Sequence, residues 1–381
     1  MNSNYVSLYS LADWKNGLAF KKIHFSNHGK PVIKIAELKN GITAPTTYTQ
    51  QIFDDSVHLT KGDMVFSWSG NPETSIDVFW YDLSDGWLNQ HIFKVMEKEG
   101  VHKLYLYYLL KSLKPQFTAI ASNKQTTGLG HVTVKDMKDM LIDLPKYNVQ
   151  KAIGEYLHFI DQKAYINQQI NDNLTELLQC VYQQQFGNTP EPISIGRLAE
   201  ICDYSRDKVA VSTLTPSTYY STENMLTEKA GAVDATSLPT VVQTTKCAVG
   251  DVLISNIRPY FKKIVYCQSE CGCSTDVLCF HPKTPDLSAY LFCTVYADCF
   301  FDFMVAGSKG TKMPRGDKQQ IMTYPVNIPS SDDLCIFNAA ALPILSHIES
   351  NRAENVRLSA LRDSLLPRLM SGEIDVSSIQ L

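Results

Sequence analysis

The stretch that decides the fold runs from Asn148 to Gly187 and reads NVQKAIGEYLHFIDQKAYINQQINDNLTELLQCVYQQQFG. Its apolar residues recur in steps of three and four, a spacing typical of one face of an α-helix. This stripe consists of Leu157, Ile160, Ala164, Asn167, Asn171, Leu174, Leu178 and Val181. Two asparagines therefore interrupt an otherwise apolar seam. In coiled coils a polar seam residue fixes register and partner.

The same pattern returns 184 positions later in the chain. Ile160 corresponds to Ile344, and Asn167 and Asn171 correspond to Asn351 and Asn355. Two such helices are expected to pack on each other, because each carries the same partly polar seam. The predicted interface consists of Ile160, Asn167, Asn171, Leu174, Ile344, Asn351, Asn355 and Leu358.

The segments that precede the two helices also repeat. Leu198-Ala199-Glu200 follows Leu11-Ala12-Asp13 at an offset of 187, and Gly250-Asp251-Val252 follows Gly62-Asp63-Met64 at 188. A near-constant offset at distant points indicates a duplicated unit of one domain and one helix. We expect an α/β (α+β) fold in which two mixed domains are joined by two long helices. The expected bounds are 1–147 and 189–330 for the domains, 148–188 and 331–376 for the helices, and 377–381 for a tail.

Local signals predict where the elements begin and end. Strands are expected at Pro31–Ile35, Asp63–Trp68, Ile76–Trp80, Trp87–Phe93 and Met140–Leu144, and shorter helices at Val101–Leu113 and Asp286–Met304. Asn148 and Asp332 are expected to cap the long helices. Pro343 should kink or interrupt the second helix, and Pro367 with Gly372 should end it. Asn188–Pro192 is the expected linker.

Composition excludes some classes of protein. The net charge of −4 argues against binding nucleic acid by bulk charge alone. The sequence contains no run of about 18 apolar residues, which is the length needed to span a bilayer. No membrane partner is therefore expected. The first residues, Met1 to Leu11, lack the cationic and apolar segments of a signal peptide, and a cytoplasmic location is therefore expected.

The ten cysteines all lie from Cys180 onward, and four of them form the cluster Cys267, Cys271, Cys273 and Cys279. The CxxxCxC spacing resembles the ligand spacing of zinc sites. No CxxC pair or nearby histidine completes a second half, and Cys279 lies in an apolar run. Reduced, buried cysteines are therefore the favoured interpretation, with a metal site as the alternative.

Motifs of catalysis are missing from the sequence. There is no GxxxxGK[ST] phosphate loop, no GxGxxG, no HExxH and no GxSxG. An amino-methyltransferase needs a tetrapeptide such as (D/N)PP(Y/F), and the nearest candidate, Asn71-Pro72-Glu73-Thr74, lacks the second proline and the aromatic residue. No catalytic or metal-binding residue is therefore predicted.

Two polar loops at equivalent places carry residue types that recognise nucleic acid. Lysine and arginine suit phosphates and guanine, and asparagine and glutamine suit adenine. A cationic, aromatic turn follows one strand of the second domain, and its counterpart follows a strand of the first. The predicted DNA-binding residues are Ser69, Asn71, Asn89, His91, Lys124, Gln125, Thr127, Asn256, Arg258, Tyr260, Lys262, Lys309, Lys312 and Arg315. The alternative for each residue is an ordinary solvated surface.

The duplicated architecture resembles the specificity subunit of type I restriction–modification systems. Four phrases are similar to common phrases of that family: Trp87–His91, Tyr220–Met225, Gly250–Tyr260 and, most specifically, Leu361–Ile374. The resemblance implies two target-recognition domains that read the halves of a split, asymmetric site in double-stranded DNA. It also implies that the long helices form an antiparallel coiled coil that sets the distance between the halves.

The same resemblance implies partners. Two methyltransferase subunits would dock on the chain, and restriction and translocase subunits would join through them. S-adenosylmethionine, ATP and Mg would then be bound by the partner subunits, and this chain would hold no cofactor. Two other classes of function remain open: a coiled-coil scaffold that binds protein alone, and a self-contained DNA-modifying enzyme.

Overall fold

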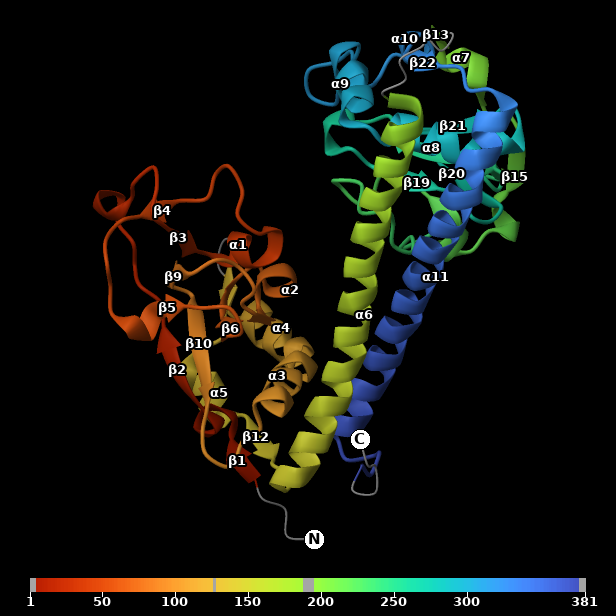
Figure 1. Ribbon diagram of the computed structural model, residues 1–381. Helices are drawn as coiled ribbons and strands as arrows, with labels where there is room; N and C mark the ends of the chain where they lie inside the picture. Colours follow the sequence, from red (N-terminus) through yellow and green to blue (C-terminus); the bar gives the residue numbers. More distant parts are fainter. Residues whose placement is uncertain (1–4, 126–127, 188–194, 377–381) are drawn as a thin grey trace. The chain divides into compact units, whose positions relative to one another are not determined.

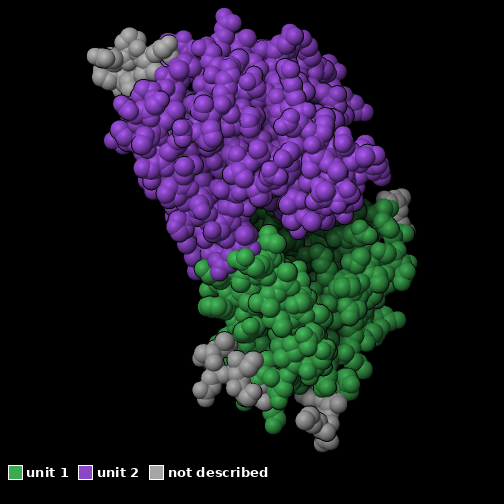
Figure 2. Space-filling model, turned by 90° about the vertical axis from the view of Figure 1, so that its right-hand side faces the viewer, with its two compact units in different colours: residues 1–165, 356–381 green, residues 166–355 purple. Residues whose placement is uncertain are grey.

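The computed structural model describes residues 5–125, 128–187 and 195–376. The expected linker Asn188–Pro192 and the tail 377–381 lie outside the described residues. The chain divides into two compact units, residues 1–165 with 356–381 and residues 166–355 (Figure 2). Each unit contains one mixed α/β domain together with a part of both long helices (Figure 1).

The first unit is built on an antiparallel sheet with the strand order β2-β10-β6-β8. These strands are Ala12–Asn16 (β2), Ile92–Glu97 (β10), Met64–Ser67 (β6) and Asp77–Trp80 (β8). Strand β6 is buried along its whole length, which its continuous apolar run Met-Val-Phe predicts. Helices α3 (Lys103–Ser112) and α4 (Lys114–Asn123) belong to the same core, in which Phe66 and Phe117 pack at 5.0 Å.

A second, smaller sheet of this unit has the order β4-β3-β9-β5 and surrounds the buried ring of Trp87. Its strands are Tyr48–Thr49 (β4), Lys30–Ile33 (β3), Gly86–Leu88 (β9) and His58–Leu59 (β5). Two short pairs complete the unit: Tyr5–Ser7 (β1) with Leu141–Asp143 (β12), and Ser69–Gly70 (β7) with Gly130–His131 (β11). The short helices are Ile35–Asn40 (α1), Pro72–Ser75 (α2) and Val134–Asp139 (α5).

The second unit repeats this plan. Its central sheet has the order β14-β21-β18-β19, with strands Cys202–Tyr204 (β14), Val277–Pro282 (β21), Val252–Ser255 (β18) and Ile264–Tyr266 (β19). A second sheet has the order β15-β17-β20-β16, with strands Lys208–Ala210, Gln243–Cys247, Cys271–Cys273 and Tyr219–Tyr220. Strand β13 (Ile195–Arg197) pairs with β22 (Pro325–Asn327), as β1 pairs with β12. The helices are Leu198–Ile201 (α7), Ser288–Tyr296 (α8), Asp298–Ala306 (α9) and Lys318–Ile321 (α10).

The two long helices are α6 (Tyr147–Tyr182) and α11 (Ser331–Met370). Inside the second unit, Asn167 contacts Asn355, and Asn171 contacts Asn351. The residue numbers rise along one helix while they fall along the other, so the helices pack antiparallel (Figure 1). Of the residues expected in the seam, Ile160, Asn167 and Asn171 are buried. Leu174, Ile344, Asn351, Asn355 and Leu358 are half-buried.

The predicted ends of the long helices need correction. Helix α11 continues through both Pro343 and Pro367, so the expected interruption and the expected end at Pro367 are wrong. Apolar side chains near both prolines are buried, Ala341 and Leu345 beside Pro343 and Leu369 after Pro367, and this packing offsets the backbone hydrogen bond that each proline lacks. The helix ends just before Gly372, whose φ of +74° suits a glycine cap, as predicted.

The predicted caps are also corrected. Helix α6 begins at Tyr147, so Asn148 lies inside its first turn and is not its cap. At the start of α11 the Ser330 hydroxyl accepts from the Asp333 amide at 3.1 Å, and Ser330, not Asp332, is the capping residue. The expected central helix to Gly187 changes after Tyr182 into a π-helical turn, Gln183–Gly187.

Two predicted elements are each divided in the structure. The expected strand Trp87–Phe93 breaks into β9 and β10, because His91 adopts a φ of +75° between them. The expected helix Asp286–Met304 is two helices, α8 and α9, bent by 68°. Within the part of the chain that the structure describes, no single helix is long and apolar enough to cross a membrane, although this bent pair passes by length and composition.

Candidate nucleic-acid interface

In the second unit, two segments far apart in sequence meet at one end of strand β18. The turn 256–262 follows this strand, and the hairpin 309–315 lies beside it. The Arg258 amide donates to the Pro314 carbonyl at 2.8 Å, and the Gly316 amide donates to the Asn256 carbonyl at 3.2 Å. Ile257 forms a β-bridge with Arg315. The structure therefore brings the predicted residues Asn256, Arg258, Tyr260, Lys309 and Arg315 into one area.

Several cations of this area are held by carboxylates. Arg315 pairs with Asp276 at 2.9 Å, and Lys309 pairs with Asp317 at 2.6 Å. The bond from Lys309, followed by backbone amides, lowers the pKa of Asp317 from its usual value. These pairs fix the side chains near the loops while they reduce the local positive charge. Lys312 is exposed and has no acidic partner among the described residues.

The turn 256–262 has an unusual backbone. Arg258 and Lys262 both adopt the left-handed conformation, with φ of +51° and +50°. Each such residue costs about 1–3 kcal/mol when it is not glycine, and such strain is common at functional sites. Lys262 also pairs with Asp298 at 3.0 Å, which raises the pKa of Lys262.

Two buried polar atoms of this turn lack a partner. They are Asn256 Oδ1 and Arg258 Nε, and neither has a hydrogen bond within the described part of the chain. An orphaned buried polar atom costs about 1–3 kcal/mol, so such atoms are rare unless a ligand or water completes them. The turn thus holds two hydrogen-bonding groups whose partners are unmet within the described part of the chain.

In the first unit, the corresponding area is formed by strands β7 and β11. Ser69 is paired with His131 in this ladder, and the Trp68 amide donates to the His91 carbonyl at 3.1 Å. The ring of His91 packs edge-on against Trp68 at 5.1 Å between centroids. Ser69 and His91 are therefore brought together, and His91 is exposed.

Some predicted residues of the first unit have structural partners of their own. The Asn71 side-chain oxygen accepts from the Glu73 and Thr74 amides and so caps α2. The Lys124 ammonium group pairs with Asp136, which lowers the pKa of this aspartate despite partial burial. Asn89 accepts from the Gln90 amide at 2.7 Å. Gln125 is exposed, and Thr127 lies outside the described residues.

Comparison with known proteins relates the first part of the chain to a family. The model of the type I restriction modification DNA specificity domain matches residues 2–176. The chain carries a type I restriction–modification specificity domain. The specificity subunit of the type I restriction enzyme EcoBI from Escherichia coli is 28% identical over 155 residues. That match spans 40% of this chain and 31% of the relative. Both matches agree with the family expected from the sequence, over the first part of the chain.

A solved structure shows that the fold extends beyond the specificity domain matched in sequence. The S subunit of a type I restriction–modification system from M. genitalium is 15% identical, with a TM-score of 0.61. The likeness covers 97% of this chain and 96% of that chain. At this level of identity the likeness concerns the fold alone, and it confirms duplicated domains joined by long helices.

One residue of the specificity domain was missed by the sequence reasoning. His131 is exposed and is the ladder partner of Ser69. The signal that could have found it is the duplication itself, since His131 precedes Arg315 by the same 184 positions that relate the long helices.

Outside the specificity domain, the cysteine cluster lies in a satellite core of the second unit. Cys247, Cys267, Cys271, Cys273 and Cys279 are all at most 3% exposed and pack with Met225 and Leu253. The Cys271 and Cys267 sulfurs are 3.5 Å apart. Among the described residues, no group of three or more histidine, cysteine, aspartate or glutamate side chains is placed to hold a metal. The burial agrees with the favoured interpretation of the sequence.

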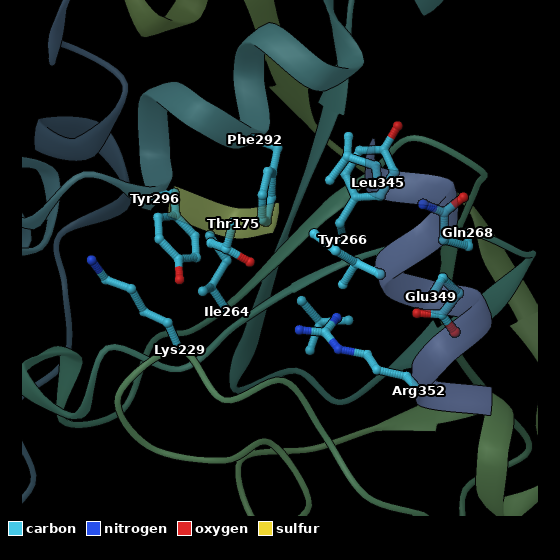
Figure 3. A pocket seen from close by; sticks show the side chains of 12 residues that line it. Thr175, Lys229, Ile264, Tyr266, Gln268, Phe292, Tyr296, Leu345, Glu349 and Arg352 are labelled. Carbon is cyan, nitrogen blue, oxygen red and sulfur yellow. The ribbon is translucent and has the colours of Figure 1, made fainter. Parts of the chain in front are cut away.

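A pocket of the second unit lies between α11 and the domain and contains Lys229, Tyr296 and Arg352 (Figure 3). Its cavity volume is about 20 Å³. A single water molecule needs roughly 10–15 Å³ by the same measure. The cavity therefore has room for water but not for a nucleotide or another organic cofactor.

Proposed function

We propose that this chain recognises a split, asymmetric sequence in double-stranded DNA, one half with each domain. The observation that carries the proposal is the pairing of two distant polar segments at the same end of the central sheet in both units. Such segments can present side chains to base edges while phosphate contacts orient the protein. The specificity domain in residues 2–176 supports this role.

We further propose that the chain is not catalytic and assembles methyltransferase and restriction subunits around the DNA. Helix α6 offers a surface for such assembly. Ile166, Ile170 and Leu177 are spaced by four and seven residues, which places them on one helix face, and each is between 41% and 50% exposed. Exposed apolar stripes of this kind mark protein interfaces. The methyltransferase would bind S-adenosylmethionine, and the restriction subunits would use ATP and Mg.

The affinity for DNA as a function of salt tests the recognition role. Each phosphate contact makes the logarithm of affinity fall by about 0.9 per unit of log salt. In the complex with a methyltransferase subunit, we expect steep salt dependence and tight binding to one sequence. Lys312→Ala should reduce the slope by about 1. Lys283→Ala is the matched control. Lys283 is an exposed lysine that follows the last residue of β21, whereas Asp276 of the candidate interface precedes the first.

Two results would contradict the proposal, and each would favour a different function. If the complex binds no DNA sequence in preference to others, the chain is a protein scaffold. If the purified chain alone transfers a methyl group to DNA, it is a self-contained enzyme. Mapping methylated adenines across a genome, with and without this chain, identifies the sequence that is read.

A further inference from the structure

The two units hold their recognition segments with the same set of backbone links. In the first unit, Trp68 follows the last residue of β6; its amide donates to the His91 carbonyl at 3.1 Å. The Trp68 carbonyl accepts from the Val132 amide at 2.9 Å. The next residue, Ser69, is the ladder partner of His131.

In the second unit, Asn256 follows the last residue of β18 and takes the place of Trp68. Its amide donates to the Asp276 carbonyl at 2.8 Å, and its carbonyl accepts from the Gly316 amide at 3.2 Å. The next residue, Ile257, forms a bridge with Arg315. The strands behind these links agree in register, since Ser67 faces Ile92 and Ser255 faces Val277.

Three identical links fix a correspondence between side chains of the two units. His131 occupies the position of Arg315, and His91 occupies the position of Asp276. In the second unit these two positions form an ion pair, Arg315 Nη2 to Asp276 Oδ1, at 2.9 Å. The first unit has two exposed imidazoles in their place.

The ion pair holds the Arg315 side chain in a position from which it could hydrogen-bond to a base. Arg315 remains 56% exposed while Asp276 engages one of its nitrogens, so the other guanidinium nitrogens stay available to a ligand. An arginine held in this way can bind O6 and N7 of guanine in the major groove with two hydrogen bonds. A histidine offers one ring nitrogen to a base edge at a time and cannot reproduce this fork.

We infer that the position shared by His131 and Arg315 is a base-reading position in each domain, with Arg315 selecting guanine through support from Asp276. His131 then gives the first domain a different base preference at the equivalent place of its half-site. This inference rests on the proposed recognition of DNA. It adds the residue that distinguishes the two half-sites and the base that one of them requires.

Selection of preferred sites from a pool of randomised duplexes, with the chain in complex with a methyltransferase subunit, tests the inference. Arg315→Ala should lower discrimination for guanine by about tenfold or more at one position of one half-site. Arg315→Lys keeps the charge but loses the fork, so the same discrimination should fall while the salt slope stays. Arg368→Ala is the matched control, since Arg368 is 52% exposed and pairs with Glu373 at 2.8 Å.

A transplant provides the second test. His91→Asp together with His131→Arg places the ion pair in the first domain, and the first half-site should then gain a guanine at the equivalent position. Equal weakening on all duplexes by Arg315→Ala would show a phosphate contact and overturn the inference. Unchanged preferences in both variants would also overturn it. If the unaltered complex shows no preference in either half-site, the proposed function itself fails.

Discussion

The Asn351 side chain donates a hydrogen bond to Asn171 Oδ1 at 2.9 Å inside the seam of the two long helices. The Asn167 side chain donates to Asn355 Oδ1, also at 2.9 Å. Asn351 is the repeat of Asn167, and Asn355 is the repeat of Asn171, so the same bond is made twice in opposite directions. A shift of either helix by one turn would break both bonds, and the register is therefore fixed.

Replacement of one asparagine of a pair should destabilise the chain more than replacement of both. Asn351→Leu leaves the buried Asn171 oxygen without this donor, and we expect a loss of about 1–3 kcal/mol in the free energy of unfolding. Asn171→Leu with Asn351→Leu should recover most of that loss, because no polar group of the pair then stays buried. Urea unfolding in a double-mutant cycle measures this coupling. Additive losses in the cycle would contradict the pairing.

Pro343→Ala should stabilise helix α11. The proline lies in the helix interior, where the missing amide and the ring clash cost up to about 3 kcal/mol. Its neighbour Leu342 is 42% exposed, and Leu342→Ala should change the free energy of unfolding by less than about 0.5 kcal/mol. A rise in urea midpoint for the first variant alone is the expected result. A helix that was interrupted at Pro343 would gain little from the alanine.

The first unit should lose stability at alkaline pH. Burial raises the pKa of Tyr105 to about 12. Burial, followed by a hydrogen bond to Asp161, also raises the pKa of Tyr108. Unfolded tyrosines ionise near pH 10, so the contribution of both rings is complete below about pH 10. It is lost as pH rises from there through the folded values. Tyrosinate absorbance and unfolding free energy, followed from neutral to alkaline pH, measure this loss, and Tyr105→Phe should reduce it.

Gly130→Ala should disrupt the ladder between β7 and β11. An added Cβ would lie 2.3 Å from the Ala121 carbonyl oxygen, which is backbone and cannot give way. We expect a loss of about 1–3 kcal/mol, with faster hydrogen exchange at the Val132 amide. Recognition of one half-site should weaken with it. Gly128→Ala is the control. Its added Cβ meets no atom within 4 Å, so this variant tests the backbone strain of a φ of +83° without a steric clash. Normal exchange at Val132 in the Gly130 variant would contradict the close approach.

The fold was predictable where periodicity and duplication agreed. The seam asparagines and the repeat of one domain and one helix follow from patterns that one sequence contains. The continuity of α11 through Pro343 did not follow, because local preference disfavours it and the packing of Leu345 overrides that preference. The break at His91 was missed for a similar reason, since a left-handed residue other than glycine has no sequence signal.

The candidate interface was predictable by residue type but not by arrangement. Arg315 and Lys309 were predicted as cations of a polar loop, but their carboxylate partners Asp276 and Asp317 were not predicted. His131 was passed over because its partner Ser69 is 62 residues away and pairs with it through the backbone alone. The DNA contacts of all these residues stay predictions.

The three links that hold each recognition segment use main-chain atoms alone. Side chains at the shared position can therefore change without loss of the bonds that hold them in place, and the cost in folding is small. On the proposed function, a single substitution at this position of one domain would change the half-site that this domain reads and leave the other half-site as it was. The two halves of the proposed target could therefore change independently of each other.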